Sequence, residues 1–543
     1  MRPSLTVLAV LLVVLAGCTG PSGDTTTTAP EPEPTTDAVE TTAVSTPTTG
    51  ETTVETTTTT TTTTDSGDGT DSGDGTDTGD GTDGSEGVEP PGEMAADIPD
   101  PETDRLGWEA GLWYNESIPV NNSDGMNATE LRLTTARAMA RVEAVRQLEF
   151  PGNETVPTKI ISREEFRERN LGNTDYSQAY RTFDNAKFEA LFYVGEDEDA
   201  LSVQESNRGS SVLGYYTPTN ESIVLVSDTG QPHIDGEETL AQEVAHALQD
   251  QRFNISEIQQ GDGTRDGYTG ALGIIEGDGN LIDSRYAERC AGEWQCVPSP
   301  GGDSQNGVPD DFNWGLYFME FVPYSDGPPF VEYYFERGGW DRINEIYRNP
   351  PQSAEQVIYP EKYGSDQPVE VELTDRTRGD WERVRPEAPR AGSSRPDYAR
   401  LGQGALSAAL MRTLYSDYKN GGVISPNEFL NSDSQDDPLN YGLNATTGWE
   451  GDRLHVYHNA ETNETGYVWR LVWESPEDAQ EFATQWEELL QYWDGQRVGD
   501  GRWEIPEWSP FTDAVSLTVD GDTVTIVNAP TTEDLGDVRE PAD

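Results

Sequence analysis

The residues of this chain best suited to chemistry lie in one short segment, where Glu243 and His246 follow Gln242. Residues four apart on a helix share a face, so Gln242 and His246 would point in the same direction. Imidazole is a strong zinc ligand, and a glutamate between two such ligands can act as a general base toward a water molecule. A neutral amide oxygen is a poor ligand beside imidazole. The segment therefore predicts a metal-type site in which His246 is the one strong ligand of the pair.

A helix must carry this segment. Asp235 is the expected N-cap, because Glu238 follows three residues later as in a capping box. The apolar face that packs this helix into its domain is predicted to consist of Leu240, Val244, Ala247 and Leu248. Gln242 and His246 lie together beside that face.

A second helical stretch, residues 268–289, is unusual in its glycine content. Each glycine in a helix interior costs about 1 kcal/mol relative to alanine, which predicts that a neighbouring element approaches closely. The glycines are Gly270, Gly273, Gly277 and Gly279. Glu276 sits among them, and Asp283 follows seven residues later on the same face.

The elements before the motif helix alternate between helix and strand, which predicts an α+β fold. Helices are expected at residues 131–148, 163–170 and 183–191, and strands at 158–161, 212–216 and 222–226. The last two strands flank a hairpin-like turn at 217–220. We expect a first domain over residues 101–393.

The C-terminal part is expected to form a smaller α+β domain over residues 394–530, followed by a flexible tail at 531–543. It contains predicted helices at 401–414 and 478–493, strands at 454–457 and 467–473, and a hairpin of strands 514–519 and 523–527. Its aromatic residues are best explained as core. We interpret it as a packing or interaction module.

A family resemblance appears at these same residues. The run TLAQEVAHALQDQ at 239–251 resembles the HELTHALQDQ signature of predicted bacterial and archaeal zinc-protease-like proteins, and IEGDG at 275–279 resembles their EGDA segment. Residues 323–330, 338–340 and 350–357 also match, and the similarity extends from about Leu131 to Pro530. With its acidity and its N-terminal signal, the chain looks most like a haloarchaeal surface-protein branch.

The resemblance implies a zincin-like first domain of the gluzincin kind, with zinc as cofactor. His246 would be a ligand, Glu243 the general base and Glu276 the third ligand, whereas Gln242 departs from the pattern. With only two strong ligands, we expect the metal to be weakly bound or absent.

The chain has four histidines, so few residues can supply the strong ligand that is missing at position 242. His233 lies just upstream of the motif helix and would do so if its loop folded back over Gln242; the alternative is a solvent-facing histidine. His455 and His458 lie in one apparent strand. Its alternation directs them to opposite faces, so they do not form a chelating pair.

Composition limits the partners. The chain carries 100 acidic and 35 basic side chains, a formal charge of −65 and only four lysines. Such a surface is tolerable where molar salt screens it, as in extreme halophiles. The alternative is an acidic protein from an ordinary organism. The charge argues against nucleic acid as a partner.

The first residues predict export. Arg2, an apolar run at 5–15 and the lipobox-like sequence LAGC at 15–18 indicate a signal peptide over residues 1–17 and lipidation of Cys18. The chain would then be lipid-anchored on the outer face of the cytoplasmic membrane; the alternative is a plain secretory signal. Residues 18–100 are rich in Thr, Asp and Gly, and predict a disordered stalk.

Export favours a disulfide between Cys290 and Cys296 over a reduced metal-binding pair. It also makes glycosylation of the asparagine sequons plausible on their number. These are Asn115, Asn121, Asn127, Asn153, Asn220, Asn254, Asn444 and Asn463.

Three functions remain open on the sequence alone. The leading hypothesis is a surface protein whose zincin-like domain has lost its activity and serves in binding or envelope structure, with envelope or surface-layer proteins as partners. The second is an active zinc metallopeptidase at the cell surface. The third is a metal site that serves only stability.

Overall fold

The computed structural model describes residues 100–540 apart from 153, 173–175, 229–230, 300–308, 310, 389–394, 432–433 and 435–436. The predicted signal peptide, Cys18, the stalk up to residue 99 and Asn153 lie outside the described residues. Within the described part, a mostly helical N-terminal region with a small mixed sheet precedes a region built on an antiparallel sheet, so the fold class is α+β as predicted.

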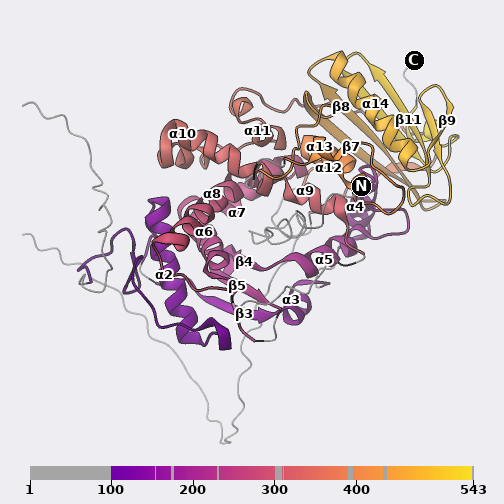
Figure 1. The fold of residues 1–543 in the computed structure, drawn as a ribbon. Coiled ribbons are helices and arrows are strands. Elements are labelled where there is room, and N and C mark those ends of the chain that lie inside the picture. The colour runs from indigo at the N-terminus through magenta and orange to yellow at the C-terminus, as the bar shows by residue number, and fades with distance from the viewer. Residues whose placement is uncertain are drawn as a thin grey trace, which may run out of the picture. The chain divides into compact units, whose positions relative to one another are not determined.

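The N-terminal part is mostly helical (Figure 1). Its strands are β1 (Trp108–Glu109), β2 (Leu112–Trp113), β3 (Thr158–Ser162), β4 (Gly214–Thr217) and β5 (Ser222–Ser227). Its helices are α2 (Ala128–Arg146), α3 (Arg163–Asn170), α4 (Gln178–Glu189), α5 (Ala200–Ser211), α6 (Glu237–Phe253), α7 (Ile255–Gln260), α8 (Arg265–Gly292), α9 (Trp314–Ser325), α10 (Gly327–Ile346) and α11 (Ala354–Ile358).

Helix α2 begins at a capping box. The Asn127 side chain accepts a hydrogen bond from the backbone N–H of Glu130 at 3.1 Å, and the Glu130 carboxylate accepts one from the backbone N–H of Asn127 at 3.0 Å. These bonds satisfy donors that the first helical turn would leave free. Most of the rest of α2 is buried, because it packs against both α6 and α8.

A three-stranded sheet with the order β3-β5-β4 precedes the motif helix. β3 and β5 are parallel, whereas β4 and β5 form the predicted antiparallel hairpin around residues 218–220. β4 is an edge strand of this sheet and contacts α6. The edge strand β4 therefore packs against the helix that carries the motif.

The C-terminal part contains a seven-stranded antiparallel sheet with the order β6-β7-β8-β12-β11-β10-β9. Its strands are β6 (Trp381–Arg383), β7 (Trp449–Asn459), β8 (Glu464–Trp473), β9 (Gln496–Gly499), β10 (Arg502–Ile505), β11 (Asp513–Asp520) and β12 (Thr523–Ala529). Its helices are α12 (Gly402–Met411), α13 (Pro426–Phe429), α14 (Pro476–Tyr492) and α15 (Leu535–Val538).

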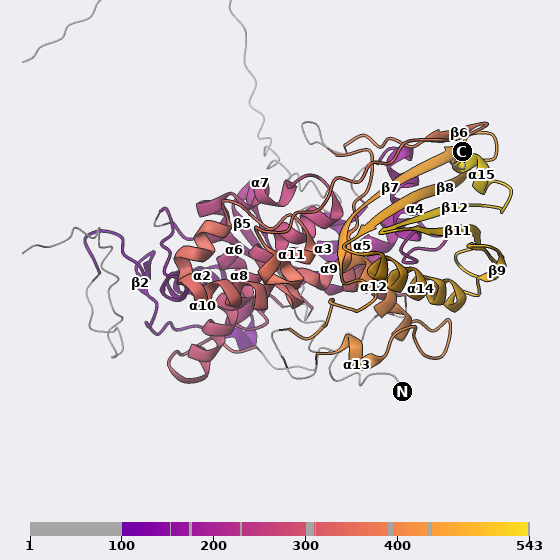
Figure 2. The same cartoon turned by 90° about the horizontal axis from the view of Figure 1, so that it is seen from above.

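Helix α14 lies along one face of this sheet (Figure 2). Its apolar residues Phe482 and Trp486 pack on Trp469 and Trp473 of β8, with ring centroids 4.7–5.7 Å apart. The same core includes Phe192, whose ring lies 5.9 Å from that of Trp486. The two predicted domains therefore share apolar contacts.

Short helix α15 lies within the segment predicted as a tail. It packs against β8, β11 and β12, and its residues Leu535 and Val538 are buried. None of the helices in the described residues is long and apolar enough to cross a membrane.

The prediction of an Asp235 N-cap is wrong. Gly236 occupies the cap position with φ +88°, and no side chain caps the helix. The Asp235 carboxylate instead accepts a hydrogen bond from the Ser299 hydroxyl at 2.7 Å. The Asp235 carboxylate is therefore bonded to a residue distant in the sequence, whereas the local pattern predicted that it would cap the helix.

Candidate functional site

The predicted site residues meet where α6 and α8 pack side by side. The glycines of α8 explain how closely other elements approach. A Cβ at Gly277 would lie 2.3 Å from the carbonyl oxygen of Gly327, and one at Gly270 would lie 2.6 Å from the backbone N of Ser353. A Cβ at Gly279 would come 3.2 Å from Cε1 of His246. Because these glycines have no side chain, α10, the start of α11 and the His246 ring can pack closely against α8.

His246 and Glu276 are brought together. His246 Nε2 lies 3.4 Å from Glu276 Oε2, and both side chains are fully buried. On the other side of the ring, His246 Nδ1 lies 2.9 Å from Gln249 Oε1. Gln249 donates from its Nε2 to the carbonyl oxygen of Ile275 at 3.0 Å, so its oxygen accepts the Nδ1 proton. The other ring nitrogen, Nε2, faces the Glu276 carboxylate.

This separation has the size that a metal site requires. Zinc binds imidazole nitrogen and carboxylate oxygen at about 2.1 Å, and two such ligands at a tetrahedral angle lie about 3.4 Å apart. Neither Glu276 oxygen has a hydrogen-bond partner among the described residues, although both are buried. With Nε2 deprotonated, this nitrogen and the Glu276 carboxylate would be two acceptors that suit a shared cation. His246 and Glu276 thus fit two ligands of one ion.

The third ligand position does not fit equally well. Gln242 lies one helical turn before His246, as predicted, and is only 5% exposed. Its amide would be the third donor, and an amide oxygen is a weaker zinc ligand than imidazole or carboxylate. Catalytic zinc sites use three protein ligands and an open position. The donor set of this chain falls one strong ligand short.

Glu243, which the family resemblance marks as the expected general base, is also fully buried. Burial raises its pKa to about 7; nearby His246 lowers this pKa, Glu276 raises it and a backbone hydrogen bond from Tyr216 lowers it. Gly214 of edge strand β4 lies against this side chain, since a Cβ there would meet Glu243 Cγ and Oε1 at 3.3 Å. β4 therefore covers the glutamate.

His233, in the loop before α6, contacts the segment before α2. Its Nδ1 hydrogen-bonds to the carbonyl oxygen of Asn122 at 2.5 Å, and the neighbouring Ile234 N–H donates to the Asn122 side chain at 3.2 Å. The loop before α6 is thus held against Asn122.

A buried ion network fixes the start of α6. The Glu237 carboxylate accepts hydrogen bonds from Arg137 and Arg141 of α2 at 2.6 Å, and from the Tyr286 hydroxyl and the Val297 N–H at 2.7 Å. Because one fully buried carboxylate binds three other elements, the motif helix has a defined position relative to α2 and α8. Nothing local in the sequence marks these long-range partners.

Cys290 and Cys296 form a disulfide at the end of α8. Arg141 donates from Nη1 toward Cys296 Sγ at 3.3 Å, and its guanidinium lies 4.7 Å from the centroid of the Trp294 ring. The loop closed by the disulfide therefore belongs to the same buried network as Glu237.

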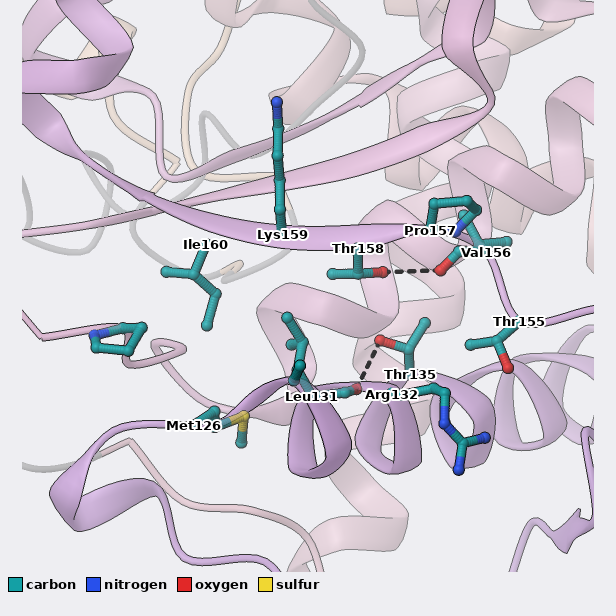
Figure 3. A pocket seen from close by; sticks show the side chains of 12 residues that line it. Met126, Leu131, Arg132, Thr135, Thr155, Val156, Pro157, Thr158, Lys159 and Ile160 are labelled. Carbon is teal, nitrogen blue, oxygen red and sulfur yellow. Dashed lines mark hydrogen bonds between the residues drawn. The ribbon is translucent and has the colours of Figure 1, made fainter. Parts of the chain in front are cut away.

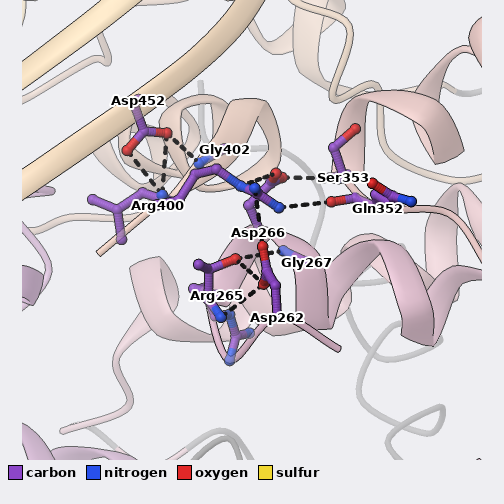
Figure 4. A network of polar contacts seen from close by, with 12 residues as sticks. Asp262, Arg265, Asp266, Gly267, Gln352, Ser353, Arg400, Gly402 and Asp452 are labelled. Atoms are coloured by element: carbon purple, nitrogen blue, oxygen red, sulfur yellow. Dashed lines mark hydrogen bonds and ion pairs between the residues drawn. The ribbon is translucent and has the colours of Figure 1, made fainter. Parts of the chain in front are cut away.

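The start of α8 is tied to the C-terminal part (Figure 4). The buried Asp266 carboxylate accepts hydrogen bonds from the Ala354 N–H at 2.9 Å and from Arg400 Nε at 3.1 Å. Asp452 of β7 accepts from the Leu401 and Gly402 N–H groups at 2.9 Å each. A Cβ at Gly402 would lie 2.0 Å from Asp266 Oδ1, so the backbone approach at this point requires glycine.

His455 and His458 lie on opposite sides of β7. His455 is buried and its Nδ1 contacts Asp375 at 2.9 Å, whereas His458 is half-buried and its Nε2 contacts Asn463 at 3.3 Å. Neither contact involves the α6–α8 site.

The asparagines of the described sequons are mostly at the surface. Asn115 is half-buried. The exposed ones are Asn121, Asn127, Asn220, Asn254, Asn444 and Asn463. Asn127 also donates from Nδ2 to Glu130 at 2.7 Å, so a sugar on that nitrogen would compete with the cap of α2.

A pocket of about 430 Å³ lies away from the site, between the start of α2 and β3 (Figure 3). Leu131 and Thr135 of α2 face Thr158 and Ile160 of β3 across it, while Lys159 points away. None of its lining residues is a predicted site residue.

Comparison with known proteins gives one partial match. A family model described as a domain of unknown function (DUF8575) matches residues 387–539, which span most of the sheet domain. No curated protein matches the chain. No solved structure matches it either.

Proposed function

We propose that this chain is an exported surface protein whose zincin-like domain keeps the layout of a metallopeptidase site without its activity. In this proposal it is lipid-anchored through Cys18 on the outer face of the cytoplasmic membrane of a halophile. It acts by binding, or as a structural part of the envelope, with other envelope or surface-layer proteins as partners. The lipobox-like signal and the charge of −65 support this location.

The proposed loss of activity rests on one observation: the site lacks one strong ligand, and its side chains are closed off from solvent. Gln242 stands at the first ligand position, and the side chains of Glu243, His246 and Glu276 are 0% exposed. Peptide hydrolysis requires that a carbonyl group and a water reach both the metal and the base. Complete burial and a two-ligand donor set oppose both requirements.

The test is cleavage of an unfolded, fluorescently labelled protein by the full chain in molar salt. We expect no cleavage above background, no effect of a chelator, and identical traces for the wild type and Glu243→Gln. Glu154→Gln, at an exposed position, serves as the matched control. Chelator-sensitive cleavage that Glu243→Gln abolishes and Glu154→Gln retains would overturn the proposal.

A second candidate is an active zinc metallopeptidase that uses Gln242 as the third ligand. The 3.4 Å separation of His246 Nε2 and Glu276 Oε2 favours it, as do the unbonded Glu276 oxygens. Zinc at this point would supply Lewis acidity toward a peptide carbonyl. Glu243, with a pKa near 7, would hold or release a proton beside it.

A third candidate, a metal that serves only stability, differs from both in its readout. Chelation would lower the melting temperature of the full chain without any cleavage. The proposed non-catalytic domain without bound metal predicts neither effect.

A further inference from the structure

Strand β3 forms one outer edge of the three-stranded sheet. The order β3-β5-β4 leaves β3 with a single neighbouring strand among the described residues. The other edge of the sheet, β4, packs against α6. The unpaired side of an edge strand carries backbone N–H and C=O groups that can pair with another chain. β3 is therefore a place where an extended segment can join the sheet.

The register between β3 and β5 identifies which backbone groups are unpaired. The two strands are parallel, with Thr158 opposite Ile223. The Ile223 N–H donates to the carbonyl oxygen of Pro157 at 2.8 Å. In a parallel pair, every second residue bonds to the neighbouring strand, so Lys159 is the next residue of β3 that bonds to β5. The N–H and C=O groups of Thr158 and Ile160 therefore point to the open side, where no other described residue bonds to them.

The same residues of β3 line the pocket of about 430 Å³ between α2 and β3 (Figure 3). Thr158 and Ile160 face Leu131 and Thr135 of α2 across it. Side chains alternate along a strand, so a strand added to β3 directs every second side chain to the face of Ile160 and into this pocket. Ligand pockets have volumes of about 300–1,000 Å³. The pocket is thus large enough to receive side chains of a segment whose backbone pairs with β3.

The charge around this pocket is opposite in sign to that of the whole chain. Two lining residues, Arg132 and Lys159, are basic and none is acidic, although acidic residues outnumber basic ones by 100 to 35 in the chain. Both are exposed. Arg169 of the adjoining α3 pairs with Glu165, whereas neither Arg132 nor Lys159 forms an ion pair among the described residues.

The two basic residues lie on different sides of the open edge. Arg132 belongs to α2, and Lys159 points to the face of β3 that is turned away from the pocket (Figure 3). An extended segment with acidic side chains on both of its faces therefore meets a positive charge on each. Complementary charge of this kind selects the partner more than it adds affinity.

We propose that the open edge of β3 and the pocket beside it bind an extended, acidic segment of another protein, which joins the sheet as an additional strand. The segment forms about four backbone hydrogen bonds with Thr158 and Ile160. Its alternate side chains enter the pocket or lie beside Lys159. This site is independent of the α6–α8 site and of the function proposed above.

The test is fluorescence anisotropy of labelled peptides of about eight residues mixed with the full chain in molar potassium chloride. The first probe alternates valine with aspartate. The second has the same sequence with alternate backbone nitrogens methylated, and the third has serine in place of aspartate. We expect the first probe to bind with one site per chain. The methylated probe should bind about tenfold more weakly or less, because it cannot form the backbone bonds, and the serine probe about threefold more weakly.

Variants of the chain separate the contribution of charge from that of the strand edge. The double variant Arg132→Gln with Lys159→Gln should weaken binding of the aspartate probe by about threefold and leave binding of the serine probe unchanged. Ile160→Pro removes an N–H that β5 does not use, so it should weaken binding of both probes in a folded protein. If Ile160→Pro lowers the melting temperature, the methylated probe tests the same bonds without a change in the protein. Arg105→Gln, at an exposed position outside the pocket, is the matched control and should bind like the wild type.

Three results would overturn the proposal. They are absence of binding by the aspartate probe, equal binding of its methylated form, and equal binding of the aspartate probe by the wild type and the double variant. Self-association of the full chain that Ile160→Pro abolishes would assign the edge to a second copy of the chain, and would overturn the proposal as well.

Discussion

At the scale of single residues, the candidate site turns on position 242. His246 and Glu276 already lie 3.4 Å apart, and Gln249 holds the histidine with its Nε2 toward the carboxylate. This arrangement leaves one strong ligand missing rather than several. The same residues would therefore form a complete donor set after a single substitution.

We predict that Gln242→His creates a zinc site. The new imidazole would lie one turn before His246 on the same helix face, completing a set of two histidines and one glutamate. Zinc titration of the full chain should show one site per chain with affinity at least about tenfold above the wild type. Gln251→His is the control, since nine residues along a helix lead to the opposite face. Equal zinc affinity of Gln242→His and the wild type would mean that Glu276 is not a ligand.

A second residue-scale prediction concerns the buried carboxyl pair Glu109 and Glu143. Both are fully buried, and Glu143 accepts hydrogen bonds from the N–H groups of Gly107 and Phe150 at 2.8 and 2.6 Å. Burial raises the pKa of Glu109 far above 4.5, and the neighbouring Glu143 raises it further. Burial also raises the pKa of Glu143.

A carboxyl group whose pKa is raised by folding contributes stability that is complete below its unfolded pKa. That contribution is lost as the pH rises toward the folded value. The free energy of unfolding should therefore fall between about pH 5 and pH 9 through this pair. Glu109→Gln should flatten this fall and stabilise the protein at pH 8 by about 1 kcal/mol or more. Denaturant titrations at several pH values measure the free energy of unfolding of both proteins, with Glu154→Gln as the exposed control. An unchanged pH slope in Glu109→Gln would refute the role of the pair.

At the scale of elements, the glycines of α8 are an example of a sequence signal that predicts packing correctly. Their number predicted a close neighbour, and the backbones of Gly327 and Ser353 do approach Gly277 and Gly270. The strand–turn–strand order before α6 and the C-terminal hairpin were also predictable, because alternation and turn residues are local signals.

We predict that Gly277→Ala destabilises the protein by about 2 kcal/mol or more, because the added methyl group would lie 2.3 Å from the Gly327 carbonyl oxygen. Gly292→Ala, at the end of the same helix, meets nothing within 4 Å and should leave stability unchanged or raise it by up to about 1 kcal/mol. Thermal and denaturant unfolding of both variants provide the comparison. Similar losses in both would show that helix propensity, not the α8–α10 contact, explains the glycine requirement.

Other elements were not predictable from local patterns. Helix α9 is buried almost all round, so it has no amphipathic period, and α10 begins with Gly327-Pro328 and contains Gly339, which indicate breaks. The Glu237 network and the hydrogen bond between Ser299 and Asp235 depend on residues 49 or more positions away. In the candidate site, the motif and the resemblance pointed to His246 and Glu276, whereas Gln249 became visible only through its contacts in the folded chain.

At the scale of the whole molecule, the main feature is the large negative net charge. A formal charge of −65 disfavours the compact state through self-repulsion, and salt screens it over a Debye length that falls from about 10 Å at 0.1 M to about 3 Å at 1 M. We predict that the free energy of unfolding of the full chain rises steadily over this range of potassium chloride. Equal stability at low and high salt would contradict the halophilic interpretation of the composition.

The most direct test of the proposed function is the zinc content of the wild-type chain. The full chain, without an affinity tag that contains histidine, would be incubated with zinc in molar salt, separated from free metal and measured by mass spectrometry. Because His246 and Glu276 are the two strong ligands, we predict well below one zinc per chain, with Gln242→His reaching about one in the same experiment. About one tightly bound zinc per wild-type chain would contradict the view that this domain has lost its metal centre.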